Sequence, residues 1–512
     1  MPGPGRGGDA RGVVPAIPVD VPAPSTSVPW RALLGAASRR AWNGTPLAGL
    51  SEDSREVGPG WIFVAHGGQQ TDGHRYIADA AAAGAALVVC ERPQPCPVPI
   101  CVVGDARAAL SELAAAWFRN PARHMRLIGV TGTNGKTSTA ALTAAVLSAA
   151  GFHPCTIGTL GVRLQDQTLR ELPWTTPPPV QLHGALAEAL AAGADSCVME
   201  VSAQAVSQNR VADCPFEVAA ITNLSREHFE YYADRDAYVQ AKADLFRHLA
   251  RRPGRPGIGV LNRRLEDLAT FRKACPGPTV EYGPGGDIEV VSTQPRALAG
   301  TDIAVRWPGR AAPVGMRVRL PGDHNVENAV CAAAVAAALD LPPSAAAAGV
   351  AAVHSVAGRL EQVVRRPVRV IVDYAHNPAG LRALLQLLRR STRGRLLVVM
   401  GARGGRDPGK RPLMGAIVAA FADQVVLTSD RPAPEDPAGA AEPMRRAVHD
   451  CGVPVRFVRD RLEAFQEALA GRSPGDCVVA VGKGRERWIG DSATAGLDDV
   501  SAFRLVLGIA AS

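Results

Sequence analysis

A glycine-rich segment between Gly129 and Thr137 constrains the fold more than any other part of the sequence. It reads Gly-Val-Thr-Gly-Thr-Asn-Gly-Lys-Thr and lies between an apolar strand predicted at 125–130 and a helix predicted at 138–150. Glycines let backbone N–H groups close around phosphate oxygens, and the helix N-terminus adds the positive end of its dipole. Val130 stands where a strict G-x-x-x-x-G-K-[ST] motif has its first glycine. The intact Gly-Lys-Thr end and the strand–loop–helix context still favour a nucleoside triphosphate site over a plain glycine-rich turn.

Apolar runs of strand length alternate with helical patterns along most of the chain. This alternation indicates parallel sheets flanked by helices. A chain of 512 residues is too long for a single hydrophobic core. We therefore predict an α/β protein with a disordered tail at 1–29 and three domains at 30–121, 122–357 and 358–512, the first opening with a short helix at 30–48. The predicted strands are 60–65, 85–90, 125–130, 196–201, 218–222, 368–373, 396–400, 424–428 and 477–481, and the predicted helices are 76–83, 138–150, 325–338, 378–389 and 437–450.

Composition excludes several classes of protein. The net charge is +8, but the arginines are scattered without a lysine-rich run, which argues against nucleic-acid binding and leaves anionic small substrates. The ten cysteines are far apart and form no C-x-x-C pair, as expected for reduced thiols. The apolar stretch 329–341 is too short to span a bilayer, and prolines interrupt the N-terminal segment where a signal peptide would lie. We expect a cytoplasmic, monomeric protein with no membrane partner.

Further motifs on both sides of the glycine-rich loop occur in a fixed order, and together with it they resemble the Mur ligase family, which builds the peptide of bacterial cell-wall precursors. The resemblance is strongest to the third-step ligases, the UDP-N-acetylmuramyl-tripeptide synthetases. It implies an N-terminal UDP-binding α/β domain, a central P-loop ATPase domain with a parallel sheet and a C-terminal Rossmann-like domain for the acceptor amino acid. The motifs are Asp53-Ser54-Arg55, Asp72-Gly73-His74, Trp174-Thr175-Thr176-Pro177, Met199-Glu200-Val201-Ser202, Gln208-Asn209-Arg210-Val211, Ala241-Lys242, Gly358-Arg359-Leu360-Glu361, Asp373-Tyr374-Ala375-His376 and Gly482-Lys483-Gly484.

The resemblance implies ATP and Mg²⁺ as cofactors and a set of catalytic residues. Lys136 would stabilise the transferring phosphoryl group, Thr137 and Glu200 would hold one Mg²⁺, and His228 would help to place a second. Lys242 matches the family's carbamylated lysine, N6-carboxylysine. Without the family motifs, Lys242 would read as a solvated lysine on a helix and His228 as a structural histidine in a turn. The implied ATP-binding residues are Gly132, Thr133, Asn134, Gly135, Lys136, Thr137, Ser138, Asn325, Arg359, Asp373 and His376.

The same resemblance assigns both organic substrates. Ser54, Thr175, Thr176, Ser202, Gln208 and Arg210 would bind a UDP-linked donor. Arg406, Asp430, Arg431, Gly482 and Glu486 would bind the acceptor amino acid.

Several substrate-reading positions depart from the family pattern. Ala203 and Gln204 stand for Ser-His, Glu227 for the aspartate before the metal histidine, and His324 for a phenylalanine. The run Gly-Cys-Gly-Gly-Asp-Arg-Asp has become Gly401-Ala402-Arg403-Gly404-Gly405-Arg406-Asp407.

The acceptor tetrapeptide departs most. Diaminopimelate-adding enzymes carry Asp-Asn-Pro-Arg and lysine-adding enzymes Asp-Asn-Pro-Ala, whereas this chain carries Asp430-Arg431-Pro432-Ala433. Ala433 offers no partner for a distal carboxylate, which favours lysine or ornithine. Arg431, Arg485 and Arg487 argue against this, because they could neutralise Glu486 or instead attract an acidic acceptor.

The sequence therefore predicts an ATP-dependent ligase that adds an amino acid to a UDP-N-acetylmuramyl dipeptide through an acyl phosphate, in peptidoglycan synthesis. The alternative is a divergent paralogue that forms an amide in a specialised metabolite. A third hypothesis is a binding protein that keeps ATP but has lost catalysis. Retention of Lys136, Glu200, His228 and Lys242 argues against it, because a pure binder needs neither a second metal nor a carbamate.

Overall fold

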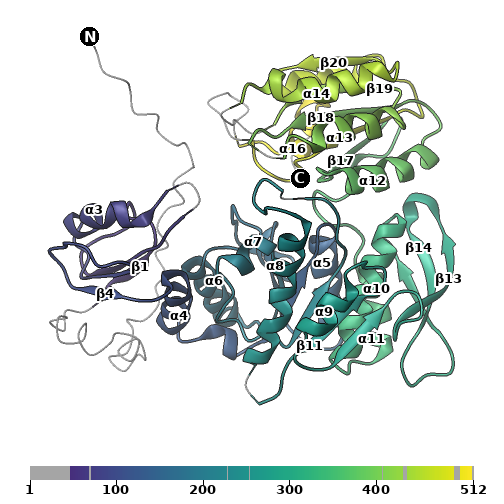
Figure 1. Ribbon diagram of the computed structural model, residues 1–512. Helices are drawn as coiled ribbons and strands as arrows, with labels where there is room; N and C mark the ends of the chain where they lie inside the picture. Colours follow the sequence, from purple (N-terminus) through teal and green to yellow (C-terminus); the bar gives the residue numbers. More distant parts are fainter. Residues whose placement is uncertain are drawn as a thin grey trace, which may run out of the picture. The chain divides into compact units, whose positions relative to one another are not determined.

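The computed structural model describes residues 47–68, 71–227, 229–252, 254–405, 407–430, 435–488 and 496–509. The described chain divides into two compact units, and Figure 1 labels their elements. Unit 1 comprises 47–121 and 179–187, and unit 2 comprises 122–178 and the described residues from 188 onward. The predicted tail and nearly all of the predicted helix at 30–48 lie outside the described residues.

Unit 1 is built on a four-stranded parallel sheet. Side chains alternate between its two faces, as they must along a strand. Ile62 and Val64 pack with Leu110 of α4 (Ala106–Trp117), whereas Phe63 packs with Ile77 of α3 (Ile77–Ala82) on the other face. The strands, in spatial order, are β1 (Gly49–Ser51), β2 (Trp61–Ala65), β3 (Leu87–Cys90) and β4 (Ile100–Val102).

Unit 2 begins with an eight-stranded sheet in which β5, the strand before the glycine-rich loop, lies between β10 and β9. Six strands run parallel, and the hairpin β7–β8 adds two antiparallel strands at one edge. In spatial order the strands are β12 (Thr279–Tyr282), β11 (Ile258–Asn262), β10 (Val218–Ile221), β5 (Arg126–Thr131), β9 (Ser196–Glu200), β6 (Pro154–Gly158), β7 (Gly161–Leu164) and β8 (Gln167–Arg170).

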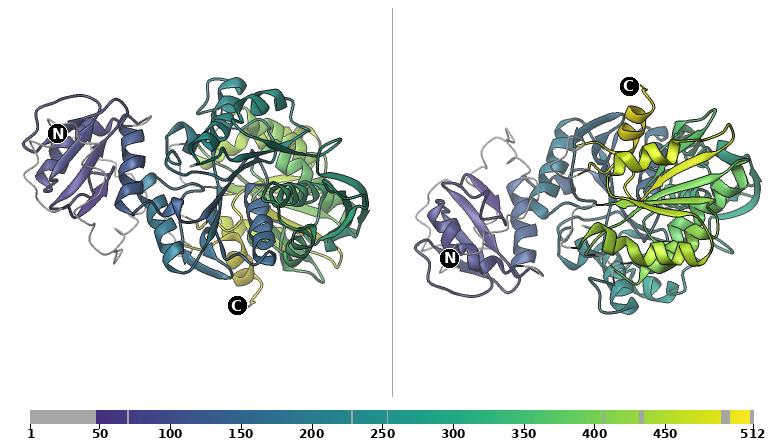
Figure 2. Two further views of the ribbon diagram at one scale, coloured as in Figure 1. Left: turned by 90° about the horizontal axis from the view of Figure 1, so that it is seen from below. Right: turned by 90° about the horizontal axis from the view of Figure 1, so that it is seen from above.

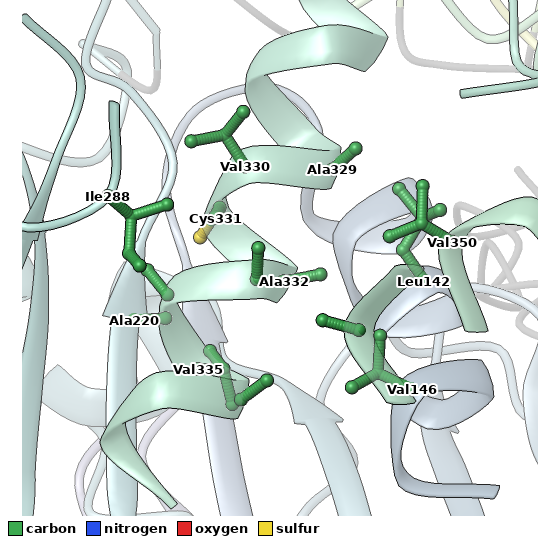
Figure 3. Packing of buried hydrophobic residues seen from close by; sticks show 14 of the residues in the cluster. Leu142, Val146, Ala220, Ile288, Ala329, Val330, Cys331, Ala332, Val335 and Val350 are labelled. Atoms are coloured by element: carbon green, nitrogen blue, oxygen red, sulfur yellow. The ribbon is translucent and has the colours of Figure 1, made fainter. Parts of the chain in front are cut away.

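The core of this part is formed around the alanine-rich helix α10 (Asp323–Ala338). In Figure 3, α10 runs between Ala220 and Ile288 on one side and Leu142, Val146 and Val350 on the other. Its neighbours are α5 (Lys136–Ala149) and α11 (Pro343–Ala352). A three-stranded antiparallel sheet of β13 (Glu289–Pro295), β14 (Thr301–Arg306) and β15 (Val314–Val318) contributes to the same core. Further helices of unit 2 are α7 (Ala203–Ser207), α8 (Arg235–Arg247) and α9 (Leu268–Ala274), and α6 (Pro179–Ala191) is shared between the two units.

The C-terminal part of unit 2 is a six-stranded sheet with helices on both faces, as the right-hand view of Figure 2 shows. Helices α12 (Pro378–Ser391), α13 (Lys410–Ala419) and α14 (Pro437–Asp450) cover one face, and α15 (Arg461–Leu469) and α16 (Asp499–Val506) cover the other. All strand pairs are parallel except β16–β17. In spatial order the strands are β16 (Glu361–Val364), β17 (Arg369–Asp373), β21 (Cys477–Val481), β18 (Leu396–Ala402), β19 (Gln424–Ser429) and β20 (Val455–Val458).

The predicted fold class is confirmed, as is each predicted strand and helix within the described residues, apart from shifts of a few residues at the ends. Many further elements were not predicted, among them the hairpin β7–β8 and the sheet β13–β15. The strands of this hairpin and this sheet are short, antiparallel and partly exposed, so they lack the continuous apolar runs that mark buried parallel strands. The exact domain boundaries stay predictions. No described helix is both long and apolar enough to cross a membrane.

Candidate active site

The glycine-rich loop lies at the carboxyl end of β5 and leads into α5. Gly132 and Gly135 have φ angles of +138° and +86°, a region that favours glycine. A Cβ at either position would overlap a side chain, Thr222 or Asn328. The Lys136 ammonium donates to the carbonyl oxygens of Gly132 and Thr133, both at 2.9 Å. The loop is therefore preformed, with its lysine held at its mouth.

Glu200, at the end of β9, joins the loop to its surroundings. Its side chain is buried and accepts a hydrogen bond from the Thr137 hydroxyl at 2.9 Å. It also accepts from the backbone N–H of Thr159 at 2.9 Å. The guanidinium of Arg359 donates to the Thr137 hydroxyl at 2.8 Å and lies over the ring of Tyr374 at 4.2 Å. The predicted metal ligands Thr137 and Glu200 therefore meet, together with the predicted phosphate ligand Arg359.

Lys242 projects from α8 into the same region and is 2% exposed, which removes the reading of a solvated lysine. Its ammonium donates to the Gly132 carbonyl at 3.0 Å and lies 4.6 Å from the centre of the Tyr238 ring. Burial and the neighbouring Lys136 lower the pKa of Lys242 well below its ordinary value, against the opposing effect of Glu227. No carboxylate is paired with this buried amine in the described part of the chain.

Five of the six predicted donor residues gather around the end of β9. The Thr176 hydroxyl donates to the Glu200 carbonyl at 2.8 Å and accepts from the backbone N–H of Ser202 at 3.0 Å. The Arg210 guanidinium donates to the Thr176 carbonyl at 2.7 Å, and to Gln208 Oε1 at 2.6 Å. Thr175 lies 3.2 Å from the Thr159 hydroxyl. Ser54, the sixth, belongs to unit 1.

The predicted ATP residues of α10 and β17 are held by local hydrogen bonds. Asn325 is buried, donates to the Pro321 carbonyl at 2.9 Å and accepts from Asn328 at 3.0 Å. Asp373 accepts from the backbone N–H groups of Leu360 and Ala375 at 2.6 and 2.7 Å.

His376 connects the β17 end to the glycine-rich loop. Its Nε2 lies 2.7 Å from Glu227 Oε1, and its neighbour Asn377 exchanges hydrogen bonds with Asn134 at 2.8 and 3.2 Å. The departure at Glu227 thus forms a bonded link between the two halves of unit 2.

At the acceptor end, Glu486 accepts from the Tyr374 hydroxyl at 2.6 Å and lies 3.7 Å from Arg403. Asp430 accepts from the buried Lys483 at 3.1 Å. Burial raises the pKa of Asp430, but the Lys483, Arg461 and Arg403 cations outweigh it and lower that pKa below the ordinary value. Gly482, with φ of +104°, follows β21 and precedes Lys483. The predicted residues His228, Arg406 and Arg431, as well as Ala433, lie outside the described residues.

A cavity of about 510 Å³ within unit 2 is lined by residues of all these groups except the one around Lys242. Sequence reasoning assigned no role in it to Thr159, Glu227, Tyr374 or Arg403. The departures from the family pattern were a signal for Glu227 and Arg403, whereas nothing in the sequence marked Thr159. Lining residues from the candidate list are Thr133, Asn134, Gly135, Lys136, Thr137, Ser138, Thr175, Thr176, Glu200, Ser202, Arg210, Asn325, Arg359, Asp373, His376 and Glu486.

A phosphate loop facing two polar clusters in one cavity defines a nucleotide-dependent group-transfer enzyme. Three family models match the chain: "Mur ligase family, catalytic domain" at 46–118, "Mur ligase middle domain" at 130–336 and "Mur ligase, glutamate ligase domain" at 358–484. The chain belongs to the Mur ligase family. It is accordingly an ATP-dependent, ADP-forming amide ligase.

Its relatives include third-step ligases. The UDP-N-acetylmuramoyl-L-alanyl-D-glutamate–2,6-diaminopimelate ligase of Bacillus licheniformis is 36% identical over 446 residues, which are 86% of this chain and 90% of that protein. The UDP-N-acetylmuramyl-tripeptide synthetase of Roseiflexus sp. is 36% identical over 465 residues, with 86% and 90% covered. A solved structure of a UDP-N-acetylmuramoyl-L-alanyl-D-glutamate–2,6-diaminopimelate ligase superposes with a TM-score of 0.62 at 29% identity, covering 91% of this chain and 96% of that one.

Proposed function

We propose that the chain adds an amino acid to a UDP-N-acetylmuramyl dipeptide, with ATP converted to ADP and phosphate through an acyl phosphate. The observation that carries the proposal is the shared cavity. It joins the phosphate loop at Lys136, the donor cluster at Arg210 and the acceptor cluster at Glu486. The three substrates, ATP, donor and acceptor, must react in sequence, and each would bind to a different part of this cavity. The names of the relatives, which are ligases acting on UDP-muramyl dipeptides, support the choice of donor.

In the activation step, a carboxylate oxygen of the donor attacks the γ-phosphorus, and the bond from that phosphorus to the bridging oxygen breaks as ADP leaves. The amine of the acceptor then attacks the acyl carbon, phosphate leaves with the electrons of the acyl C–O bond, and the amine loses a proton. Lys136 and Arg359, which lie at the mouth of the loop, would stabilise charge on the transferring group.

Thr137 and Glu200 fit a magnesium site. Their oxygen atoms are 2.9 Å apart beside the phosphate loop, and Mg²⁺ in such sites uses one or two protein oxygens together with phosphate oxygens and water. The ion would neutralise charge between the phosphates and the attacking carboxylate. Among the described residues, no three His, Cys, Asp or Glu side chains cluster as a metal site, so the protein's own share would be small.

The environment of Lys242 supports its carbamylation. A neutral amine can attack CO₂ and lose a proton to form a carbamate, and burial favours the neutral form of Lys242. The product would place a carboxylate beside Gly132 and near Lys136, where the described residues supply none to the amine. The change would convert a buried amine into an anion near the Lys136 cation.

The donor assignment is tested on Arg210. Calorimetry with UDP-N-acetylmuramyl dipeptide should show binding to the wild type that weakens at least about tenfold in Arg210→Ala, because a charge-assisted contact is lost. Arg247→Ala, an exposed change on α8, serves as the matched control. Hydroxylamine should also trap an acyl hydroxamate when donor and ATP are present. A wild type that neither binds this donor nor forms the hydroxamate would move the assignment to the paralogue that makes a specialised metabolite.

A further inference from the structure

Arg403 occupies an unusual place among the cations at the acceptor end. It follows β18 at the carboxyl edge of the six-stranded sheet, lines the cavity, and its side chain is 24% exposed. In the described part of the chain its one paired carboxylate is Glu486, with Nη1 and Oε2 separated by 3.7 Å. This distance exceeds that of a hydrogen bond, and a guanidinium carries five N–H donors. A hydrogen bond between Arg403 and Tyr374 uses part of this capacity, and in the described part of the chain the remaining N–H donors are available to a ligand.

The neighbouring cations are occupied. Arg485 pairs with Glu361 at 2.5 Å and with Asp498 at 3.1 Å, and Arg487 pairs with the exposed Glu171 at 2.7 Å. Neither lines the cavity. Lys483 is held by Asp430, and the buried Arg461 is held by Asp499 through two hydrogen bonds. Of the charges that the sequence placed around Glu486, Arg485 and Arg487 are thus excluded as substrate ligands.

Glu486 is oriented by its other oxygen. The Tyr374 hydroxyl donates to Oε1 at 2.6 Å, while Oε2 faces Arg403. Burial would lower the pKa of Arg403, but Glu486, Tyr374 and Asp430 raise it above the ordinary value. The cavity therefore presents a carboxylate and a guanidinium side by side, 3.7 Å apart.

We propose that Arg403 is a specificity-determining residue that binds a carboxylate at the distal end of the acceptor, beside a distal ammonium bound by Glu486. The inference rests on the proposed function and specifies its acceptor. An acceptor whose distal carbon bears both an ammonium and a carboxylate matches the adjacent Glu486 and Arg403. Each of its charges is then paired when water leaves the site. Lysine or ornithine would bring no distal carboxylate to Arg403, and glutamate would bring no distal ammonium to Glu486. The preferred class is a diamino dicarboxylic acid.

This assignment replaces the preference for lysine or ornithine that Ala433 suggested. Ala433 removes one possible partner of a distal carboxylate, but Arg403 supplies another from a different strand end. In sequence terms, Arg403 stands at a position where the family run has glycine. The cation for a distal carboxylate would thus come from the residue after β18, whereas in diaminopimelate-adding enzymes it comes from the segment that corresponds to the one after β19.

The experiment compares kcat/KM for diaminopimelate, lysine, ornithine and glutamate in the wild type, Arg403→Ala, Arg403→Lys and the surface control Arg487→Ala. The wild type and the control should prefer diaminopimelate. Arg403→Ala should lose about tenfold or more for diaminopimelate and less than about threefold for lysine. Arg403→Lys should recover part of the loss, because it keeps the charge without the planar fork. Thermal unfolding of each variant checks that the fold is retained.

Two outcomes overturn the proposal: a wild type that prefers lysine, ornithine or glutamate, or an Arg403→Ala enzyme in which all acceptors lose activity equally. Trapping of the acyl phosphate by hydroxylamine separates this result from the proposed function, because trapping requires donor and ATP but no amino acid. Absence of trapping in the wild type contradicts the proposed function. Normal trapping with an acceptor ranking that Arg403→Ala leaves unchanged contradicts the role of Arg403 alone.

Discussion

The phosphate loop and the acceptor end of the cavity are both built at the carboxyl edge of a parallel sheet, but they are held in different ways. At the loop, Asn134 alone takes part in five hydrogen bonds: its backbone N–H and carbonyl bond to Asn223 and Thr222, and its side chain bonds to Asn377. At the acceptor end, Arg403 and Glu486 face each other across 3.7 Å.

The difference indicates which part of the site can change without loss of catalysis, the part for phosphoryl transfer or the part for acceptor choice. Phosphoryl transfer requires the same charges at the same places whatever the substrate, so rigid, multiply bonded groups suit it. In our proposal, acceptor choice depends on a small number of charges at the other end of the cavity, of which Arg403 is one. Changes at the loop should therefore abolish catalysis, and changes at the acceptor end should alter preference.

The largest expected effect is that of Lys136→Ala. Loss of the cation that tracks the transferring group should lower kcat by about 10³-fold or more, as for other cations in phosphoryl transfer. Phosphate release with saturating donor, ATP and acceptor measures the effect. Lys273→Ala, an exposed change on α9, is the matched control. An Lys136→Ala enzyme with more than a tenth of wild-type turnover would mean that this loop is not the catalytic phosphate site.

Lys242→Ala tests whether the site around the phosphate loop includes a carbamate. We expect a loss of about 100-fold, the upper range seen when a group that supports a metal site is removed. Short carboxylic acids such as formate should restore part of the activity by supplying the missing oxygens. Mass spectrometry of the native wild type should show an added CO₂ that Lys242→Ala lacks. Full activity of the alanine variant would refute a catalytic role.

The smallest effect is expected for Tyr374→Phe, which tests whether the two ends are separable. The ring would stay beneath Arg359, while the hydrogen bond to Glu486 would be lost. One such bond corresponds to a rise of about 2- to 10-fold in KM for the acceptor. KM for ATP should not change. Tyr76→Phe on the surface of unit 1 is the control, and an equal rise in both KM values would show that the ends act as one unit.

The fold and the rigid end of the site could be predicted because their signals are local. The loop residues lie within six consecutive positions, from Gly132 to Thr137. Glu200 is the last residue of the buried strand β9. The parallel strands that were predicted are mostly apolar runs, which are visible without knowledge of their neighbours.

The acceptor end could not be read in the same way, because its charges are paired over long stretches of sequence. Arg485 is neutralised by Glu361 across 124 positions and Arg487 by Glu171 across 316. From the sequence, both arginines remained candidates for attracting an acidic acceptor. Arg403 gained its role only when β18 and β21 were placed side by side and brought Glu486 within reach.

The alanines of α10 determine how closely α10 packs against α5, and this distance also affects the position of the phosphate loop. Ala329 and Ala332 are fully buried in the cluster that also holds Leu142 of α5. Helices with such small side chains approach closely, so the thickness of this layer fixes where the first turn of α10 stands. The next turn carries Asn328, which accepts from Thr139 of α5 at 3.3 Å and abuts Gly135. Adding two methyl groups at Ala332, remote from any substrate, would move Asn325 and the phosphate loop apart. A substitution in the dry interior of this enzyme can therefore act as though it lay in the nucleotide site.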